Sequence, residues 1–320
     1  LRPKPKWLHD CPTLYGTLLA ETGDTKAQQE VGTFYRRGIG TPIDLAQAKH
    51  WYERAIAGGR DYALAPLARV EAALGNGEAA YALLQRAIDA DMPGAARQLG
   101  FAHIDKQLGQ HSDPSLGLRL LLQLIDDGDH PAARPLLLRY NWNRLPLPAP
   151  DSLVAQVEAD GLAGDGPSAE AALVYLTKTD RHSRSTRARR QALIEVEGIR
   201  QNILASERIL LAADLSPGSF LREADRIVAQ TSREHFSRAA LTTYRVSPNA
   251  YVRILQEELQ MSGYYAGRIN GRLTASTIAA HHRFCADMGI LDQCREGPLK
   301  WATIRAVTEA LSTLSPVGLK

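Results

Sequence analysis

Two histidines and two cysteines near the end of the chain are the residues best suited to chemistry. His281 lies four positions before Cys285, so the two share a face if a helix forms there, and Cys294 closes a ten-residue stretch. A disulfide between the cysteines would suit an oxidising compartment and brace a small domain. Two free thiols, or a metal site completed by His281 and His282, are the alternatives, although the spacing is not a familiar zinc pattern. We predict the disulfide and no metal.

The rest of the sequence contains no string with the spacing of a known catalytic motif. Gly-x-Ser-x-Gly, His-Glu-x-x-His and Gly-x-x-x-x-Gly-Lys-Ser/Thr are all absent. Adjacent carboxylates such as Glu257-Glu258 and Asp126-Asp127 would point about 100° apart on a helix, which is typical of solvated faces. We therefore predict a protein that is not an enzyme and has no cofactor. Residues 151–245 are the only space in which a catalytic site could form in three dimensions.

Five arginines lie in the segment DRHSRSTRARR, Asp180 to Arg190. Such a run can bind an anionic polymer, or it can be a flexible loop with solvated side chains, which we favour. The whole chain carries 38 Lys and Arg against 35 Asp and Glu, a net charge of +3. That balance gives no reason to expect a nucleic acid partner.

The stretch SGYYAGRING, Ser262 to Gly271, holds a pair of adjacent tyrosines among three glycines spaced four residues apart. Helical patterns flank it, so the chain must reverse here, and glycines supply backbone angles that other residues avoid. We expect Tyr264 and Ile269 to fold inward. Tyr265 should stay partly exposed, where its ring could stack on a sugar.

The first half of the chain repeats a pair of helices. Residues 27–59 read as two helices with a glycine-rich turn between them. Alanine pairs at Ala95-Ala96 and Ala132-Ala133 lie 37 residues apart, and Ala63 precedes Ala95 by 32. A helix pair that recurs every 32–37 residues predicts an α-solenoid, and the fold class as a whole is all-α.

The segment VGTFYRRGIGTPIDLAQAKHWYERAIAGG, residues 31–59, resembles a Sel1-like repeat, a relative of the tetratricopeptide repeat. In later copies, Tyr81-Ala82 and Leu121-Leu122 are expected where the family has Trp-Tyr. The resemblance implies a solenoid that offers a surface to a protein partner. The structural residues of the repeat that it implies are Gly32, Tyr35, Gly38, Gly40, Ala48, Trp51, Tyr52 and Ala55.

The proline-rich hexapeptide Leu145–Pro150 predicts a domain boundary, because its prolines prevent a helix from continuing. Beyond it the pattern remains helical and includes one long periodic helix from Leu193 to Ile209. We assign residues 1–145 to the repeat solenoid, 151–245 to a helical continuation, and 246–320 to a separate C-terminal domain.

The C-terminal segment YVRILQEELQMSGYYAGRINGRLTASTIAAHHRF resembles the small helical peptidoglycan-binding module found beside cell-wall enzymes. The resemblance implies three helices and a glycan site at the turn, formed by Tyr264, Tyr265, Arg268, Asn270 and Arg272. The chain departs from the family pattern at Asn270 and at Cys285, where Asp and Gln are usual. The matching residues are Leu255-Gln256, Leu259, Gly263-Tyr264-Tyr265, Gly267, Ile269-Asn270-Gly271, Thr277, Phe284 and Gly289-Ile290.

The compartment follows from indirect signs. The chain starts at Leu1 without Met, so we expect a processed chain whose signal peptide is gone. No apolar run approaches the roughly 18 residues needed to span a bilayer. The predicted disulfide then indicates the bacterial periplasm. Cys11 has no partner in this pattern, and we expect it to be buried or to pair outside this chain, with a lipid-bearing cysteine as the alternative.

These signs together predict a non-catalytic periplasmic scaffold. Its repeats would bind an envelope protein, and its C-terminal domain would bind peptidoglycan or a related glycan, in cell-envelope assembly or exopolysaccharide export. One alternative is an enzyme or accessory subunit of cell-wall or polysaccharide metabolism. Another is a degenerate C-terminal module that now serves for protein docking.

Overall fold

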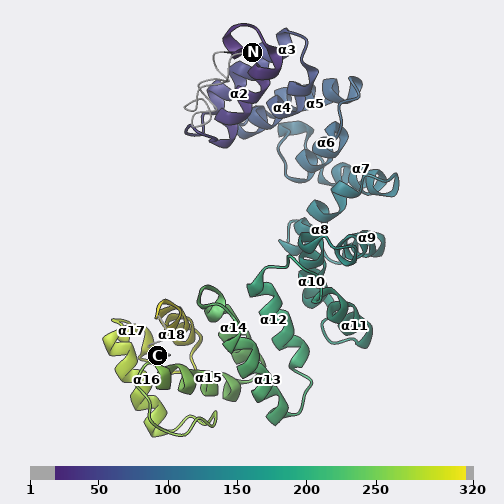
Figure 1. Ribbon diagram of the computed structural model, residues 1–320. Helices are drawn as coiled ribbons and strands as arrows, with labels where there is room; N and C mark the ends of the chain where they lie inside the picture. Colours follow the sequence, from purple (N-terminus) through teal and green to yellow (C-terminus); the bar gives the residue numbers. More distant parts are fainter. Residues whose placement is uncertain (1–18, 315–320) are drawn as a thin grey trace, which may run out of the picture. The chain divides into compact units, whose positions relative to one another are not determined.

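The computed structural model describes residues 19–314, and every regular element within that range is a helix (Figure 1). The prediction of an all-α fold is confirmed. The chain divides into two compact units, Leu1–Leu136 and Leu137–Lys320. Cys11 lies outside the described residues, so its predicted roles stay untested.

The first unit is a solenoid of helical hairpins, each packed on the next. Short 3₁₀ helices lie in three of the connections between helices, and α8 (Ala133–Asn141) contains the boundary to the second unit. The hairpins are α2 (Thr25–Arg37) with α3 (Leu45–Ala57), α4 (Leu64–Ala73) with α5 (Gly77–Asp89), and α6 (Ala95–Ile104) with α7 (Pro114–Asp126). The 3₁₀ helices are η2 (Asp61–Ala63), η3 (Gly109–His111) and η4 (His130–Ala132).

Small buried residues mark the starts of α4, α6 and α8. Ala63, Ala95 and Ala132 are all buried, so the spacings of 32 and 37 residues do reflect structural repeats. At the end of α2, Gly38 takes the left-handed conformation (φ 70°) and closes the helix, and Asp44 caps α3 by accepting the N–H of Gln47 at 2.9 Å.

The predicted positions of the later Trp-Tyr equivalents were wrong by one or two residues. The second helices start after Asp44, Asn76 and Asp113, and this register aligns Trp51-Tyr52 with Leu83-Leu84 and Leu120-Leu121. Tyr52, Leu84 and Leu121 are all buried. The error arose because the loops that precede the three second helices differ in length.

The second unit consists of ten further helices after α8 within the described range. Helices α9 (Asp151–Leu162) and α10 (Gly166–Asp180) form another hairpin. The others are α11 (Arg184–Leu193), α12 (Gln201–Ala212), α13 (Pro217–Ala229), α14 (Arg233–Val246), α15 (Pro248–Met261), α16 (Ala275–Asp287), α17 (Leu291–Cys294) and α18 (Trp301–Thr313).

Two expectations for the middle of the chain were wrong. The arginine-rich segment is not a solvated loop, because most of it forms α11, whose first turn is capped by Ser183. The long helix expected from Leu193 to Ile209 is broken, since α11 ends at Leu193 and α12 starts at Gln201. Gly198 lies in the break with φ +82°, a conformation that interrupts a helix.

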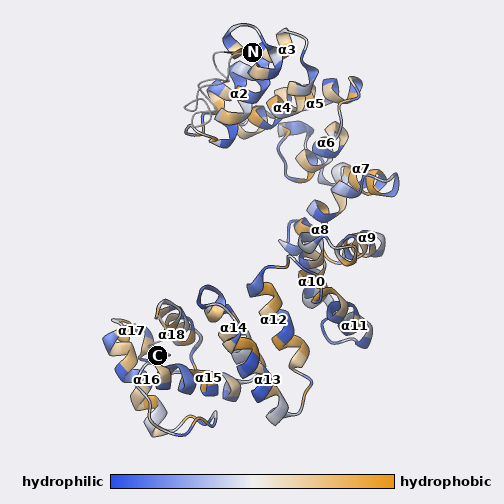
Figure 2. Cartoon of the chain, viewed as in Figure 1, coloured by the Kyte–Doolittle hydropathy of each residue, from blue (hydrophilic) through white to orange (hydrophobic). Residues whose placement is uncertain are grey.

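A single hydrophobic core extends from α12 to α18. Helix α14 packs against both α12 and α18, and the Tyr244 hydroxyl donates to the carbonyl of Leu299 at 2.7 Å. Figure 2 shows hydrophobic residues alternating with hydrophilic ones along α12 and α14, as expected for helices with one buried face. Residues 246–314 therefore share their core with α12–α14. The domain limits drawn from the sequence stay predictions.

Candidate functional site

The turn between α15 and α16, residues 262–274, is held by the buried side chain of Gln256. Its amide oxygen accepts the N–H groups of Asn270 (2.9 Å) and Gly271 (3.0 Å). Its amide nitrogen donates to the carbonyl of Arg272 (2.9 Å) and to the hydroxyl of Thr277 (3.0 Å). One side chain thus fixes the backbone of the turn from inside the core. The sequence analysis matched Gln256 to a family pattern but gave it no role.

Both tyrosines of the turn pack against the core, and the second of them is the more deeply buried. Tyr265 is only 6% exposed, and its hydroxyl donates to the carbonyl of Arg268 at 3.1 Å. The expectation that its ring is partly exposed was therefore wrong. Tyr264 is half-buried, with its ring set edge-on to Phe284 at a centroid distance of 5.4 Å. Gly263, with φ +79°, reverses the chain so that the second tyrosine enters the core.

Three predicted glycan-binding residues remain on the surface of the turn. Arg268, Asn270 and Arg272 are exposed, and the Asn270 side chain accepts the N–H of Arg272 at 2.9 Å. This side-chain contact shapes the turn, and a carboxylate could make it as well as an amide. Among the described residues, neither arginine forms an ion pair. The turn can therefore offer two unpaired cations, an amide and one edge of Tyr264 to a ligand.

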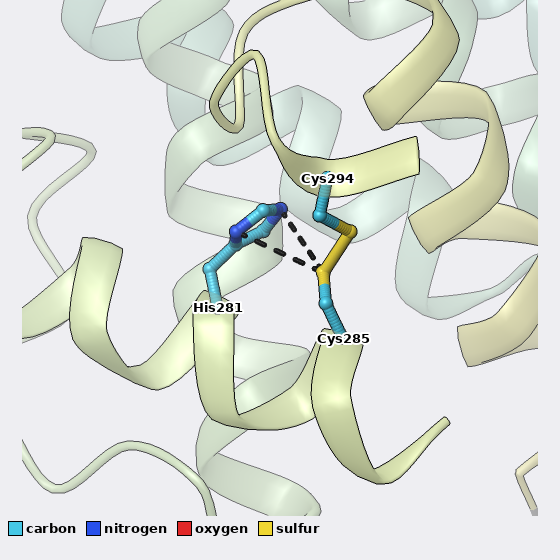
Figure 3. Close-up of side chains that lie close together, drawn as sticks. All are labelled: His281, Cys285 and Cys294. Carbon is cyan, nitrogen blue, oxygen red and sulfur yellow. Dashed lines mark hydrogen bonds between the residues drawn. A yellow bond between two sulfur atoms is a disulfide. The ribbon is translucent and has the colours of Figure 1, made fainter. Parts of the chain in front are cut away.

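Cys285 and Cys294 form a disulfide that joins α16 to α17 (Figure 3). The His281 ring points at it, with its nitrogens 3.9 and 3.7 Å from the Cys285 sulfur. All three ligand atoms lie within 4.8 Å of one another, which is the arrangement behind the metal alternative. The two cysteine sulfurs are bonded to each other in the disulfide, however. Neither is therefore a thiolate that could bind a metal. Closing this loop stabilises the fold by roughly 2.5–3 kcal/mol on the loop-entropy estimate.

His281 is kept neutral by its surroundings. The side chain is 2% exposed, and burial, with a smaller contribution from the charge of His282, lowers its pKa from 6.5 to about 4. A neutral imidazole beside a disulfide is a packed structural group at neutral pH. We assign it no catalytic role.

A cluster of arginines joins the first helices of three consecutive hairpins. Arg36 and Arg37 end α2, Arg69 lies in α4, and Arg97 lies in α6. Desolvation lowers the pKa of Arg69 most. The positive charges of Arg36, Arg37 and Arg97 lower it further by electrostatic repulsion. Arg97 also pairs with Asp129 at 3.3 Å, and Arg36 donates to the Tyr52 hydroxyl at 3.3 Å.

The sequence analysis did not identify this arginine cluster. The spacing from Arg36 to Arg69 is 33 residues and from Arg69 to Arg97 is 28, so no constant period reveals it. Its chemistry is that of an anion-attracting surface, because several like charges lie together and, among the described residues, Arg97 is the one of the four that forms an ion pair.

The fold is that of an all-helical repeat protein. The chain matches no family model. It is 49% identical over 43 residues to the chitin synthase regulator SKT5 of Malassezia restricta, a match that covers 13% of this chain and 3% of that protein's length. Within the described range, no helix combines the length and the apolar character required to cross a membrane.

Two solved structures are similar to this chain at low identity. One is a Sel1 repeat protein from Oxalobacter formigenes, with 16% identity, 68% of this chain and 95% of that chain covered, and a TM-score of 0.43. The other is a protective antigen of uropathogenic Escherichia coli with an SLR fold, with 14% identity, 93% and 74% coverage, and a TM-score of 0.39.

Proposed function

We propose that this protein is a non-catalytic scaffold of the bacterial periplasm. Its helical repeats bind an envelope protein through an acidic surface of that partner. Its C-terminal region binds peptidoglycan or a related glycan, in cell-envelope assembly or exopolysaccharide export. The observation that carries the proposal is the arginine cluster on α2, α4 and α6.

The arginine cluster favours a partner because its charges oppose one another. Arg36, Arg37, Arg69 and Arg97 come from three hairpins, so an acidic surface of a partner that spans these hairpins could contact several of them at once. Acidic groups there would oppose the repulsion among these arginines, which adds to desolvation in lowering the pKa of Arg69. Repeat solenoids commonly bind proteins in this manner, with each repeat supplying a few side chains.

The glycan part of the proposal is supported by the exposed polar side chains of the turn at 262–274. Arg268 and Arg272 can donate to sugar hydroxyls or to muramyl carboxylates, and Asn270 can both donate and accept. The closed disulfide supports an oxidising compartment. The burial of Tyr265 and the shared core favour a second candidate, in which this region docks a protein instead.

Site-specific photo-crosslinking tests the protein-binding part. A photoreactive residue placed at Arg37 or Arg69 in the full chain should yield the same crosslinked envelope protein, identified by mass spectrometry. The matched control is Arg86, an exposed arginine on α5, the second helix of its hairpin. Equal crosslinking from Arg86 would show that the arginine cluster is not the binding surface.

Co-sedimentation with purified peptidoglycan sacculi tests the glycan part. The full chain should pellet with sacculi, and the double variant Arg268→Ala/Arg272→Ala should pellet less. The control Arg295→Ala/Arg305→Ala removes the same charge from exposed positions on the later helices. A folded full chain that does not pellet would remove glycan binding and leave the docking alternative.

A further inference from the structure

We propose that a pocket in the second unit, separate from the turn at 262–274, binds a short oligosaccharide that carries carboxylates. The pocket has a volume of about 720 Å³, within the size range of small-ligand sites. Its walls come from α10, α11, α12 and α14, and Trp301 at the start of α18 completes it. The lining residues lie up to 127 positions apart in the sequence, from Val174 to Trp301.

The floor of the pocket is a buried ion pair that is fully satisfied. Arg190 is 1% exposed, and its guanidinium donates to Glu207 at 2.9 and 2.7 Å. The Thr177 hydroxyl lies 2.8 and 2.9 Å from the two oxygens of the same carboxylate. Because Arg190 neutralises Glu207, the floor adds no net charge to the pocket and holds α10, α11 and α12 in place.

The rim of the pocket is positively charged. Arg181, Arg238 and Arg245 are exposed, and among the described residues none of them contacts a carboxylate in an ion pair. Lys178 also lines the pocket, but its ammonium group donates to neutral carbonyls and to the Asn143 side chain, so its charge is not cancelled. The second carboxylate of the lining, Asp214, is already paired with Arg187. An anionic ligand is therefore favoured.

The remaining lining favours a sugar. Trp301 is 44% exposed, and the Arg245 guanidinium lies 4.8 Å from the centre of its ring, so an aromatic and a planar cation stand together at the rim. The hydroxyls of Ser206 and Thr242 line the same pocket. A sugar can place its apolar C–H face on Trp301, its hydroxyls on the polar side chains and its carboxylates on the arginines.

An acidic peptide fits this lining less well. An extended peptide gains much of its affinity from backbone hydrogen bonds to a strand edge or to free backbone groups. Most of the lining here comes from helices, whose backbone groups are bonded within each helix. At the helix ends, the carbonyls of Arg181 and Leu211 accept from Arg190 and Arg187. The pocket therefore offers mainly side chains, which suits the many hydroxyls of a saccharide.

The arginine-rich segment, Asp180 to Arg190, contributes less positive charge to this pocket than its five arginines would indicate. Arg187, Arg189 and Arg190 are used in ion pairs with Asp214, Glu158 and Glu207. Of the run, Arg181 alone brings an unpaired cation to the rim. Arg238 and Arg245 come from α14, which the sequence analysis did not connect with anion binding.

Titration of the full chain with trigalacturonate tests the proposal. Binding is followed by calorimetry and by tryptophan fluorescence, with neutral maltotriose and a triglutamate peptide as comparison ligands. We expect saturable binding of trigalacturonate and a weakening of about tenfold or more in Arg238→Gln and in Arg245→Gln. Arg305→Gln, an exposed change of equal charge outside the pocket, should bind as the wild type does.

Trp301→Phe locates the ligand, because it should abolish the fluorescence response while calorimetry still detects binding. Thermal unfolding of each variant shows that the fold is intact. Absence of binding, equal binding of maltotriose, or an equal loss in Arg305→Gln would overturn the proposal. Binding of triglutamate as tight as that of trigalacturonate would assign the pocket to an acidic protein segment and overturn the saccharide assignment.

Discussion

Gln256 shows how one buried side chain can determine a whole turn. Its amide satisfies two backbone donors, one carbonyl and one hydroxyl that the turn would otherwise leave buried without partners. Leaving such groups unpaired costs more than the hydrogen bonds themselves contribute. The conformation of residues 262–274 therefore depends on a residue that lies outside it, in α15.

Replacing Gln256 tests this dependence. Gln256→Ala should destabilise the second unit by about 2–4 kcal/mol, because several buried polar groups lose their partner at once. The control is Gln260→Ala, an exposed position on the same helix, which should change the unfolding free energy by less than about 0.5 kcal/mol. Urea denaturation followed by circular dichroism measures both. Similar values for the two variants would refute the role given to Gln256.

His281 should make stability fall in mild acid. Its folded pKa of about 4 lies below its ordinary 6.5, so between these values the unfolded chain binds more protons than the native one. Stability is therefore lost as the pH falls through this window, by an amount on the order of 2–3 kcal/mol between pH 7 and 4.5.

The variant His281→Gln stays neutral at every pH and should lose this part of the pH dependence. His282→Gln, at the exposed neighbouring position, should keep it. Urea denaturation at pH 7 and pH 4.5 gives the comparison. A pH dependence in His281→Gln equal to that of the wild type would show that another group is responsible.

The sequence predicted which residues make the turn but not which way they point. Glycine spacing and the Gln256 pattern were visible in the sequence, whereas the inward position of Tyr265 depends on the reversal at Gly263. Predictions of which side chains face inward use the period of a strand or helix. They fail where a residue with positive φ interrupts that period.

At the scale of elements, a similar close contact between backbones occurs in each of the two units. Gly77 begins α5 and packs against Leu108 and Gly109, while Gly166 begins α10 and packs against Gly198 and its predecessor. Each pair of glycines is separated by 32 residues. The recurrence indicates that the repeat geometry of the first unit is used again within the second.

Adding a methyl group at either position should be costly. In Gly77→Ala the new carbon would overlap the backbone of Gly109, and in Gly166→Ala it would lie 2.5 Å from the Glu197 carbonyl oxygen. Backbone atoms cannot rotate away, so we expect a loss of about 1–3 kcal/mol in unfolding free energy. Denaturant unfolding of the full chain measures it.

Gly218→Ala is the matched control, because its new carbon would meet only the Arg222 side chain at 3.9 Å. That variant should be neutral or more stable by up to about 1 kcal/mol, as the alanine restricts the unfolded chain. If Gly77→Ala behaved like Gly218→Ala, the backbones could not be in contact.

Helix limits show where sequence periodicity is a weak guide. The apolar spacing from Leu193 to Ile209 suits one continuous helix, yet Gly198 interrupts it, because its φ of +82° does not fit a helix. From the sequence, the arginines of α11 were expected to be solvated. In the structure, Glu158 and Glu207 from other helices are partners of two of them. These partners are distant in sequence, so a local pattern could not reveal them.

At the scale of the whole molecule, a C-terminal region that resembles an independent module shares its core with the helices before it. The buried residues of α12–α14 and α15–α18 form one cluster. Polar contacts cross between the same helices, since the Ser237 hydroxyl lies 2.9 Å from that of Thr308 and Tyr244 donates to Leu299. Removing α14 would expose the apolar face of α18 to water.

Two fragments test whether the shared core is needed for folding. Residues 137–320 should be helical and unfold cooperatively, because they contain the entire cluster. Residues 246–320, even with the disulfide closed, should show weak helicity, no cooperative thermal transition and poorly dispersed amide resonances, since a domain of this size cannot spare part of its core. A sharp transition in the shorter fragment would establish an independent module. The predicted boundary near residue 246 would then be a true domain limit, and α14 would be an accessory to a fold that forms without it.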